Sequence, residues 1–177
     1  MAITLTKSKG GSAPAAGWHS GTIKKCEKGN FNNSNYYDVY LDSLHENMRC
    51  RVWEARNSSG EEFSIGNLIR YSNPEILEEV SNNGEDAIVK VDDAPNSLVG
   101  KRIQVFVYKK DNGYMDVLQN KVAPAEPFEN IIDTFDENRI NYIKSAAETY
   151  HNNKVGSTTS GPVRVGNQDV ELEDAPF

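Results

Sequence analysis

Stretches in which apolar and polar residues alternate dominate the chain between residues 17 and 123. Three of them come early, at residues 18–27, 36–41 and 48–54, and two more follow at 102–109 and 114–120. Alternation with a period of two is typical of strands that bury one face. Turn-forming residues separate these stretches, and an Asn-Gly pair predicts a tight hairpin between the last two. The pattern therefore predicts a mainly β domain of five strands.

A helix is expected between the third and fourth strands. Asn73 and Pro74 suit a helix cap and a first helical position, and Ile76, Leu77 and Val80 recur at helical spacing behind them. Three strands, a helix and two strands form the element order of the five-stranded OB barrel. The predicted fold is thus an OB-type barrel over residues 17–123.

The segments on either side of residues 17–123 lack this alternation of apolar and polar residues. Residues 1–16 are small and polar and indicate a flexible lead-in. Residues 124–152 carry apolar positions, Ile140, Ile143 and Ala147 among them, that approximate one face of a C-terminal helix. Residues 153–177 begin as a Gly/Ser/Thr-containing linker, which is typical of flexible chain, and end in an acidic tip.

Composition narrows the class of protein. Hydrophobic residues make up 37% of the chain and charged residues 25%, a balance typical of soluble globular proteins. No apolar run approaches the roughly 20 residues that cross a bilayer, and no secretory signal is evident, so we expect no membrane partner. Cys26 and Cys50 lie in predicted strands and indicate free thiols. We expect a cytoplasmic protein, in the host cytoplasm if the chain is viral.

The net charge of -7 is unevenly distributed. Residues 1–60 contain eight Lys/Arg and five Asp/Glu, a balance of +3, whereas residues 124–177 contain four and ten, a balance of -6. Overall acidity would argue against a nucleic-acid ligand, but the first strands are locally basic. The charge therefore permits a nucleic-acid site on the barrel.

Side chains alternate across a strand, so each predicted strand has two faces. One face is aliphatic and suits the barrel interior, while the other mixes aromatic rings with arginines, as in Arg49, Arg51 and Trp53. Bases of single-stranded DNA stack on such rings while Arg and Lys follow the phosphates. The candidate DNA-binding residues are Lys24, Lys25, Lys28, Phe31, Tyr36, Tyr40, Arg49, Arg51, Trp53, Arg102, Phe106, Tyr108, Lys109 and Lys110.

Packing offers an alternative for these rings. Aromatic residues are favoured in strands, and some of them must cover the core or meet the C-terminal helix. Two arginines flanking one ring suit an apolar core poorly. The group of Arg49, Arg51 and Trp53 therefore favours a binding role more than the other rings do.

The last nine residues, DVELEDAPF, combine four carboxylates with a terminal Pro-Phe pair. After a flexible linker, this ending resembles the C-terminal tip of bacterial single-stranded DNA-binding proteins. The resemblance implies that the tip docks on replication and recombination proteins, with the Phe ring in an apolar pocket and basic partner residues around the carboxylates. The alternative is a tail that only aids solubility. The candidate tip residues are Asp169, Glu171, Glu173, Asp174, Pro176 and Phe177.

The barrel region resembles a different group. The stretch from Gly17 through the Asn-rich turn to residues 36–41, and the closing GYMDVLQNKVAPAE, are similar to phage-encoded OB-fold single-stranded DNA-binding proteins. The resemblance implies coating of single strands during phage replication, recombination or repair. It does not imply the tetrameric state of the bacterial family, and whether the protein forms homo-oligomers remains open.

No catalytic constellation is evident in the sequence. The histidines and cysteines form no CxxC or HxxxH pair, so no metal is expected, and no phosphate-binding loop or nucleophile motif occurs. We expect a non-enzymatic protein without cofactors. Two alternatives to a coating protein stay open: a protein-interaction adaptor that binds no DNA, and a phage strand-annealing recombination protein.

Overall fold

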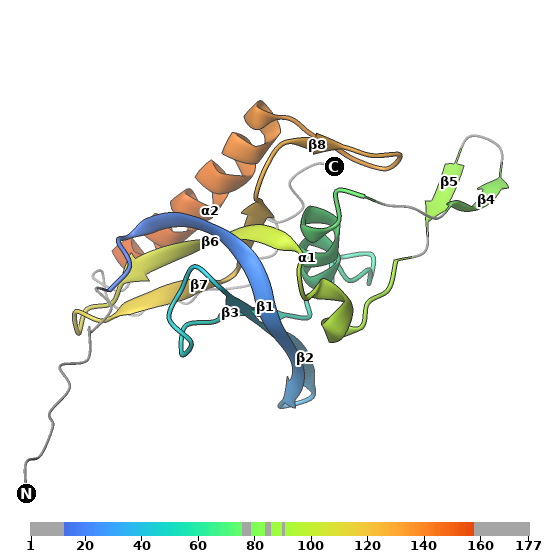
Figure 1. Ribbon diagram of the computed structural model, residues 1–177. Coiled ribbons are helices and arrows are strands. Elements are labelled where there is room, and N and C mark those ends of the chain that lie inside the picture. The colour runs from blue at the N-terminus through green and yellow to red at the C-terminus, as the bar shows by residue number, and fades with distance from the viewer. Residues whose placement is uncertain (1–12, 76–78, 84–85, 90, 158–177) are drawn as a thin grey trace, which may run out of the picture.

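The computed structural model describes residues 13–75, 79–83, 86–89 and 91–157, with the backbone alone at 79–83, 86–89 and 155–157. Figure 1 shows a curved sheet with a helix along one side and a second helix at one end. In chain order the elements are β1 (Gly17–Phe31), β2 (Ser34–Leu41), β3 (Cys50–Trp53), α1 (Ser64–Ser72), β4 (Glu79–Asn83), β5 (Asp86–Val89), the 3-10 helix η1 (Pro95–Leu98), β6 (Arg102–Lys109), β7 (Met115–Pro124), β8 (Phe128–Glu129), β9 (Thr134–Phe135) and α2 (Glu137–Ser157).

Five antiparallel strands form the main sheet, in the order β3-β2-β1-β6-β7. Its two edges meet through side chains: the Cys50 thiol contacts the Leu118 carbonyl at 3.5 Å, and the Trp53 backbone N–H donates to Asn120 at 2.7 Å. The sheet is thereby a nearly closed barrel. Its connectivity, with the helix between the third and fourth barrel strands, is that of the OB fold and confirms the predicted fold class.

The long strand β1 serves both halves of the barrel. Its first part pairs with β6, from Gly17 to Thr22, and its second part pairs with β2, from Ile23 to Phe31. The register shifts between Ile23 and Lys25, which is the signature of a β-bulge and bends the strand. The bulge also changes the alternation, so that Ile23 and Cys26 both face the interior.

Aliphatic side chains fill the barrel, as the alternation predicts. The residues Val39, Val52, Ile103, Val105 and Val107 are at most 1% exposed. Leu98 of the 3-10 helix η1 and Leu68 of α1 complete this interior, and both are fully buried. The core is therefore one continuous cluster, which holds the outer faces of the strands in fixed register.

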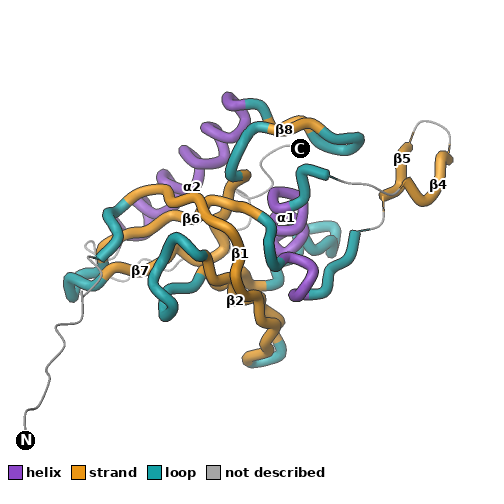
Figure 2. Tube along the Cα trace, in the orientation of Figure 1, coloured by secondary structure: helices purple, strands orange, loops and turns teal. Residues whose placement is uncertain are grey.

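The helix between the third and fourth barrel strands is confirmed, but it does not begin at Asn73: Val80 lies in β4, and Ile76 and Leu77 lie outside the described residues. The helix between β3 and β6 is α1, which ends at Ser72, and Asn73 follows it instead of capping a new helix. The start of α1 is held by Glu62, whose carboxylate accepts from the backbone N–H groups of Ile65 and Gly66 at 2.8 and 2.9 Å. After Pro74 the described chain forms the β4–β5 hairpin, which stands apart from the main sheet in Figures 1 and 2.

The C-terminal helix α2 exists but is displaced along the chain from the predicted 124–152. Residues 128–135 form the small β8–β9 hairpin, and α2 runs from Glu137 to Ser157, into the predicted linker. The Asp136 carboxylate caps α2 by accepting from the Arg139 N–H at 2.8 Å. Figure 1 shows α2 along the side of the barrel formed by β6 and β7.

The other differences concern strand ends. β1 continues to Phe31 and β2 begins at Ser34, because Asn32 and Asn33 both adopt positive φ and make a two-residue hairpin turn in place of the predicted longer loop. β3 is shorter than predicted, and β7 extends to Pro124. The predicted lead-in up to residue 12, the rest of the linker and the acidic tip lie outside the described residues.

Candidate nucleic-acid interface

A buried carboxylate organises the outer face of β2 and β3. Asp38 lies directly opposite Arg51 in the β2–β3 register. The Arg51 Nε donates to one Asp38 oxygen at 2.7 Å and a terminal nitrogen to the other at 2.8 Å. This paired geometry is the strongest common form of ion pair, and the carboxylate raises the pKa of the Arg51 guanidinium. From the sequence, Arg51 was identified as a candidate residue but Asp38 was missed.

The guanidinium of Arg51 also stacks on aromatic rings. It lies 3.8 Å from the Tyr36 ring centroid and 5.5 Å from that of Trp53, and the two rings meet edge-on at 5.0 Å. Behind them the Tyr36 ring rests on Gly29 of β1, where a Cβ would lie 2.3 Å from the ring. Tyr36, Arg51 and Trp53 are termed the platform below. All three are partly exposed on the outside of the barrel.

An open hollow adjoins the platform. It has a volume of about 440 Å³, within the rough range of 300–1,000 Å³ usual for ligand sites. Its lining residues are Cys26, Glu27, Lys28, Tyr36, Asp38, Pro95 and Asn96. A planar group stacked beside Tyr36 therefore finds polar surroundings, with one ammonium group and the carboxylates of Glu27 and Asp38.

Basic side chains flank the platform along β1 and β3. Lys24 and Lys28 are exposed on β1, while Lys25 pairs with Glu27 at 3.0 Å and lies 5.0 Å from the Tyr40 ring. Glu27 therefore offsets part of the positive charge expected from this group. Arg49, which precedes β3, is 43% exposed and also contacts Asp38.

Two hairpin tips expose large rings. Phe31, at the β1–β2 tip, is 61% exposed, and Tyr114, at the β6–β7 tip, is 74% exposed. In OB folds these two loops and the face of strands two and three form the usual oligonucleotide site. Tyr114 was missed from the sequence, although its place beside the Asn112-Gly113 turn was a usable signal. Phe31 was predicted.

The β6 part of the predicted face is arranged differently. Phe106 and Tyr108 lie beneath α2, with the His151 ring 5.7 and 4.7 Å from their centroids. Trp18 of β1 joins them: its ring lies tilted against Phe106 with the centroids 5.4 Å apart, and its indole N–H donates to Glu148 at 2.8 Å. Burial lowers the pKa of His151, with a smaller contribution from Lys154. These rings pack against α2 and remain only partly exposed.

The charged residues in and directly after β6 form ion pairs or lie near the β6–β7 tip. Arg102 forms an ion pair with Glu126, and Lys110 pairs with Asp116 at 2.8 Å. Lys109 is exposed near the β6–β7 tip. The structure thus brings together the predicted residues of β1, β2 and β3, and separates Arg102, Phe106 and Tyr108 from them.

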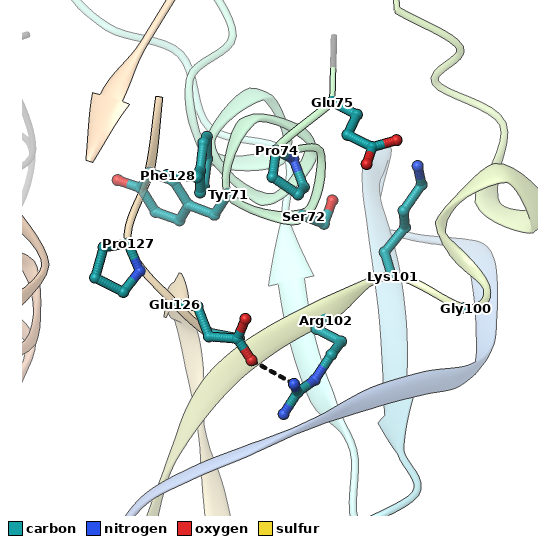
Figure 3. Close-up of a pocket in the computed structure, with 11 residues that line it drawn as sticks. Tyr71, Ser72, Pro74, Glu75, Gly100, Lys101, Arg102, Glu126, Pro127 and Phe128 are labelled. Atoms are coloured by element: carbon teal, nitrogen blue, oxygen red, sulfur yellow. Dashed lines mark hydrogen bonds and ion pairs between the residues drawn. The ribbon is translucent and has the colours of Figure 1, made fainter. Parts of the chain in front are cut away.

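A second cavity lies on another part of the molecule, between the end of α1 and the segment that follows β7. Its volume is about 290 Å³, and Figure 3 shows Tyr71, Pro74 and Phe128 around it, with the Arg102–Glu126 ion pair at one edge. Its charged lining residues are Glu75, Lys101, Arg102 and Glu126. Opposite charges balance, so this cavity offers no basic surface for a phosphate chain.

Other reactive groups are few in the described part of the chain. Cys26 and Cys50 are free and buried, and burial raises the pKa of each thiol to about 12. Such thiols are poor nucleophiles at neutral pH. Among the described residues no three His, Cys, Asp or Glu side chains gather in a way that could hold a metal ion. No described helix combines the length and the apolarity that a bilayer span requires.

No known family profile matches the chain, and no curated protein is significantly similar to it in sequence.

Proposed function

We propose that this protein binds single-stranded DNA on the outer face of β2 and β3, with little sequence preference. One observation carries the proposal: the Arg51 guanidinium stacks on Tyr36 at 3.8 Å beside Trp53, on the exposed side of an OB-type barrel. Leaving two rings and a guanidinium partly exposed to water in one cluster does not by itself stabilise the fold. The cluster matches the needs of unstacked bases, each of which gains about 1–3 kcal/mol on an aromatic ring.

The surroundings of the platform support a path for a strand. Phe31 and Tyr114 expose rings at the two hairpin tips, and Lys24, Lys28 and Arg49 supply positive charge for phosphates. Every base has a flat face, so stacking tolerates most sequences. Coating of single strands during replication, recombination or repair, in a phage or a bacterium, fits this tolerance.

The acidic tip forms the second part of the proposal. Residues 169–177 lie outside the described structure, and their sequence carries four carboxylates and a terminal Phe177. An acidic segment is repelled by DNA and suits basic pockets on other proteins. We assign it the recruitment of replication or recombination proteins. A cytoplasmic location agrees with the two free cysteines.

The test is a titration of the full-length protein with labelled oligo-dT across a series of salt concentrations. Binding that weakens as salt rises supports the DNA-binding proposal, because phosphate contacts release counterions. Undetectable binding, or binding indifferent to salt, would favour the protein-interaction adaptor instead. A strand-annealing assay with complementary oligonucleotides separates a coating protein from an annealing protein.

A further inference from the structure

Asp38 holds two arginines in different ways. Arg51 engages both carboxylate oxygens, at 2.7 and 2.8 Å, and its side chain is only 22% exposed. Arg49 reaches a single oxygen, at 3.1 Å, and its side chain is 43% exposed. One guanidinium is therefore locked, and the other is held by one contact at the surface.

The burial of Asp38 makes this difference consequential. Its side chain is only 9% exposed, and a buried carboxylate left without a cation is strongly destabilising. Arg51 alone satisfies both oxygens, so Arg49 can leave without stranding the charge. The departure of Arg51 would cost more than that of Arg49, because it would also break the stack on Tyr36.

We propose that Asp38 is a positioning residue that gives the two arginines separate tasks in binding a nucleic-acid strand. Arg51 stays on Asp38 and presents the platform to the bases. Arg49 exchanges its contact with Asp38 for a contact with a backbone phosphate. The inference rests on the proposed function, since it assigns these tasks within the same site.

Base contacts and charge contacts then become separable by measurement. Each phosphate that a cation neutralises adds about 0.7 to the slope of log affinity against log salt for a single strand. A base contact instead appears as a preference for oligo-dT over an abasic oligonucleotide of the same length, which keeps the phosphates and lacks the bases. Arg49 should govern the slope, and Arg51 the preference.

Two variants of the full-length protein test this division. Arg49→Gln should make the salt slope shallower by about 0.7 and leave the preference for oligo-dT unchanged. Arg51→Lys keeps the charge but loses the planar group that stacks and pairs at two points. It should reduce the preference by about fivefold or more and leave the slope unchanged.

Asp38→Asn tests the positioning role itself. The site gains one positive charge, so the slope should become steeper by about 0.7, while the loosened Arg51 lowers the preference for oligo-dT. Asp133→Asn is a matched control: Asp133 is also buried, pairs at two points with Arg70 at 2.9 and 2.5 Å, and lies 4.0 Å from Arg139. Asp133→Asn should change neither the salt slope nor the preference for oligo-dT.

Several results would overturn the inference. A lower preference for oligo-dT in Arg49→Gln, or an unchanged preference in Arg51→Lys, would show that the two arginines do not divide these tasks. An Asp38→Asn protein that binds more weakly with the same slope and the same preference would make Asp38 a purely structural residue. If Asp38→Asn does not fold, Arg49→Gln and Arg51→Lys still test whether the two arginines have separate tasks. A wild-type protein that binds no oligonucleotide would instead defeat the proposed function, and this inference with it.

Discussion

The backbone N–H of Trp53 donates a hydrogen bond to the side-chain oxygen of Asn120 at 2.7 Å, across the two edges of the main sheet. Asn120 has a φ of 64° and lies where the pairing of β6 with β7 shifts between Val105 and Val107. The bulge turns its side chain toward β3. At this point the barrel is closed by a side chain in place of a backbone ladder, directly beside the platform.

Substitution of Asn120 should therefore destabilise the barrel. Asn120→Ala leaves the Trp53 N–H without its acceptor and keeps a left-handed backbone that alanine disfavours, a loss of about 2 kcal/mol or more in unfolding free energy. Urea denaturation measures it. Asn120→Asp keeps an acceptor and should lose less, whereas Asn120→Gly relieves only the backbone strain. Equal losses for Asp and Ala would contradict a role for the hydrogen bond.

The platform rings should dominate the affinity for single strands. Trp53→Ala and Tyr36→Ala should each weaken oligo-dT binding by about 5- to 150-fold, the equivalent of about 1–3 kcal/mol per stacked base. Fluorescence anisotropy gives the dissociation constants, and circular dichroism checks the fold. Tyr142→Ala removes an equally conspicuous ring, 55% exposed on α2, and should leave affinity unchanged. Similar losses in all three variants would argue against a localised site.

The two exposed hairpin tips should contribute to binding without contributing to stability. Phe31→Ala and Tyr114→Ala remove rings that are 61% and 74% exposed, so unfolding free energies should stay within about 0.5 kcal/mol of wild type. Each should still reduce the affinity for a long oligo-dT. Ile132→Ala, at the tip of the β8–β9 hairpin and 45% exposed, is the control. Unchanged affinity in both tip variants would confine the site to the platform.

The docking of α2 should weaken in acid. His151 packs against Phe106 and Tyr108, its pKa is lowered by burial, and Lys154 is the charged neighbour that adds to the effect. The unfolded chain therefore binds a proton more readily than the folded one. Stability from this group is present above the ordinary histidine pKa of about 6.5 and is lost as pH falls below it.

Thermal unfolding at a series of pH values measures that loss. His151→Gln should remove this part of the pH dependence, whereas His45→Gln, in the exposed β2–β3 connection, is the control for a general effect of losing a histidine. An unchanged profile in His151→Gln would mean that other groups govern the acid sensitivity.

Removal of Asp169–Phe177 should preserve or increase the affinity for oligo-dT, because the segment contributes four carboxylates and no cation. Recruitment of partner proteins should be lost at the same time. A variant that lacks only Phe177 separates the ring from the charge: it should lose recruitment and bind DNA as wild type does. Loss of DNA binding on deletion of the tip would contradict its proposed role.

The barrel was largely predictable because its strands obey a simple period. The strand Arg102–Lys109 has the predicted bounds, since Ile103, Val105 and Val107 alternate with polar and aromatic residues. The helix was placed too late, because Asn73 and Pro74 are strong local signals. The carboxylate of Glu62, which holds the start of α1 through Ile65 and Gly66, lies outside the usual capping pattern.

The site was only partly predictable, for reasons of register and tertiary packing. Alternation put Arg51 and Trp53 on one face, but the pairing of Asp38 with Arg51 depends on which residues lie opposite in β2 and β3. No local pattern shows that α2 covers Phe106 and Tyr108, because that contact joins segments far apart in the chain. Sequence periodicity predicts which residues share a face of a strand, but the tertiary fold determines which of those faces pack against a helix.

The contact between Gly29 and the Tyr36 ring carries a consequence for the platform. No side chain fits at position 29 while the ring lies across it, so any substitution of Gly29 has to displace the Tyr36 ring from its present place. The displaced ring would no longer lie 3.8 Å from the Arg51 guanidinium. Gly29 is therefore part of the platform, although it carries no group that could itself hold a ligand.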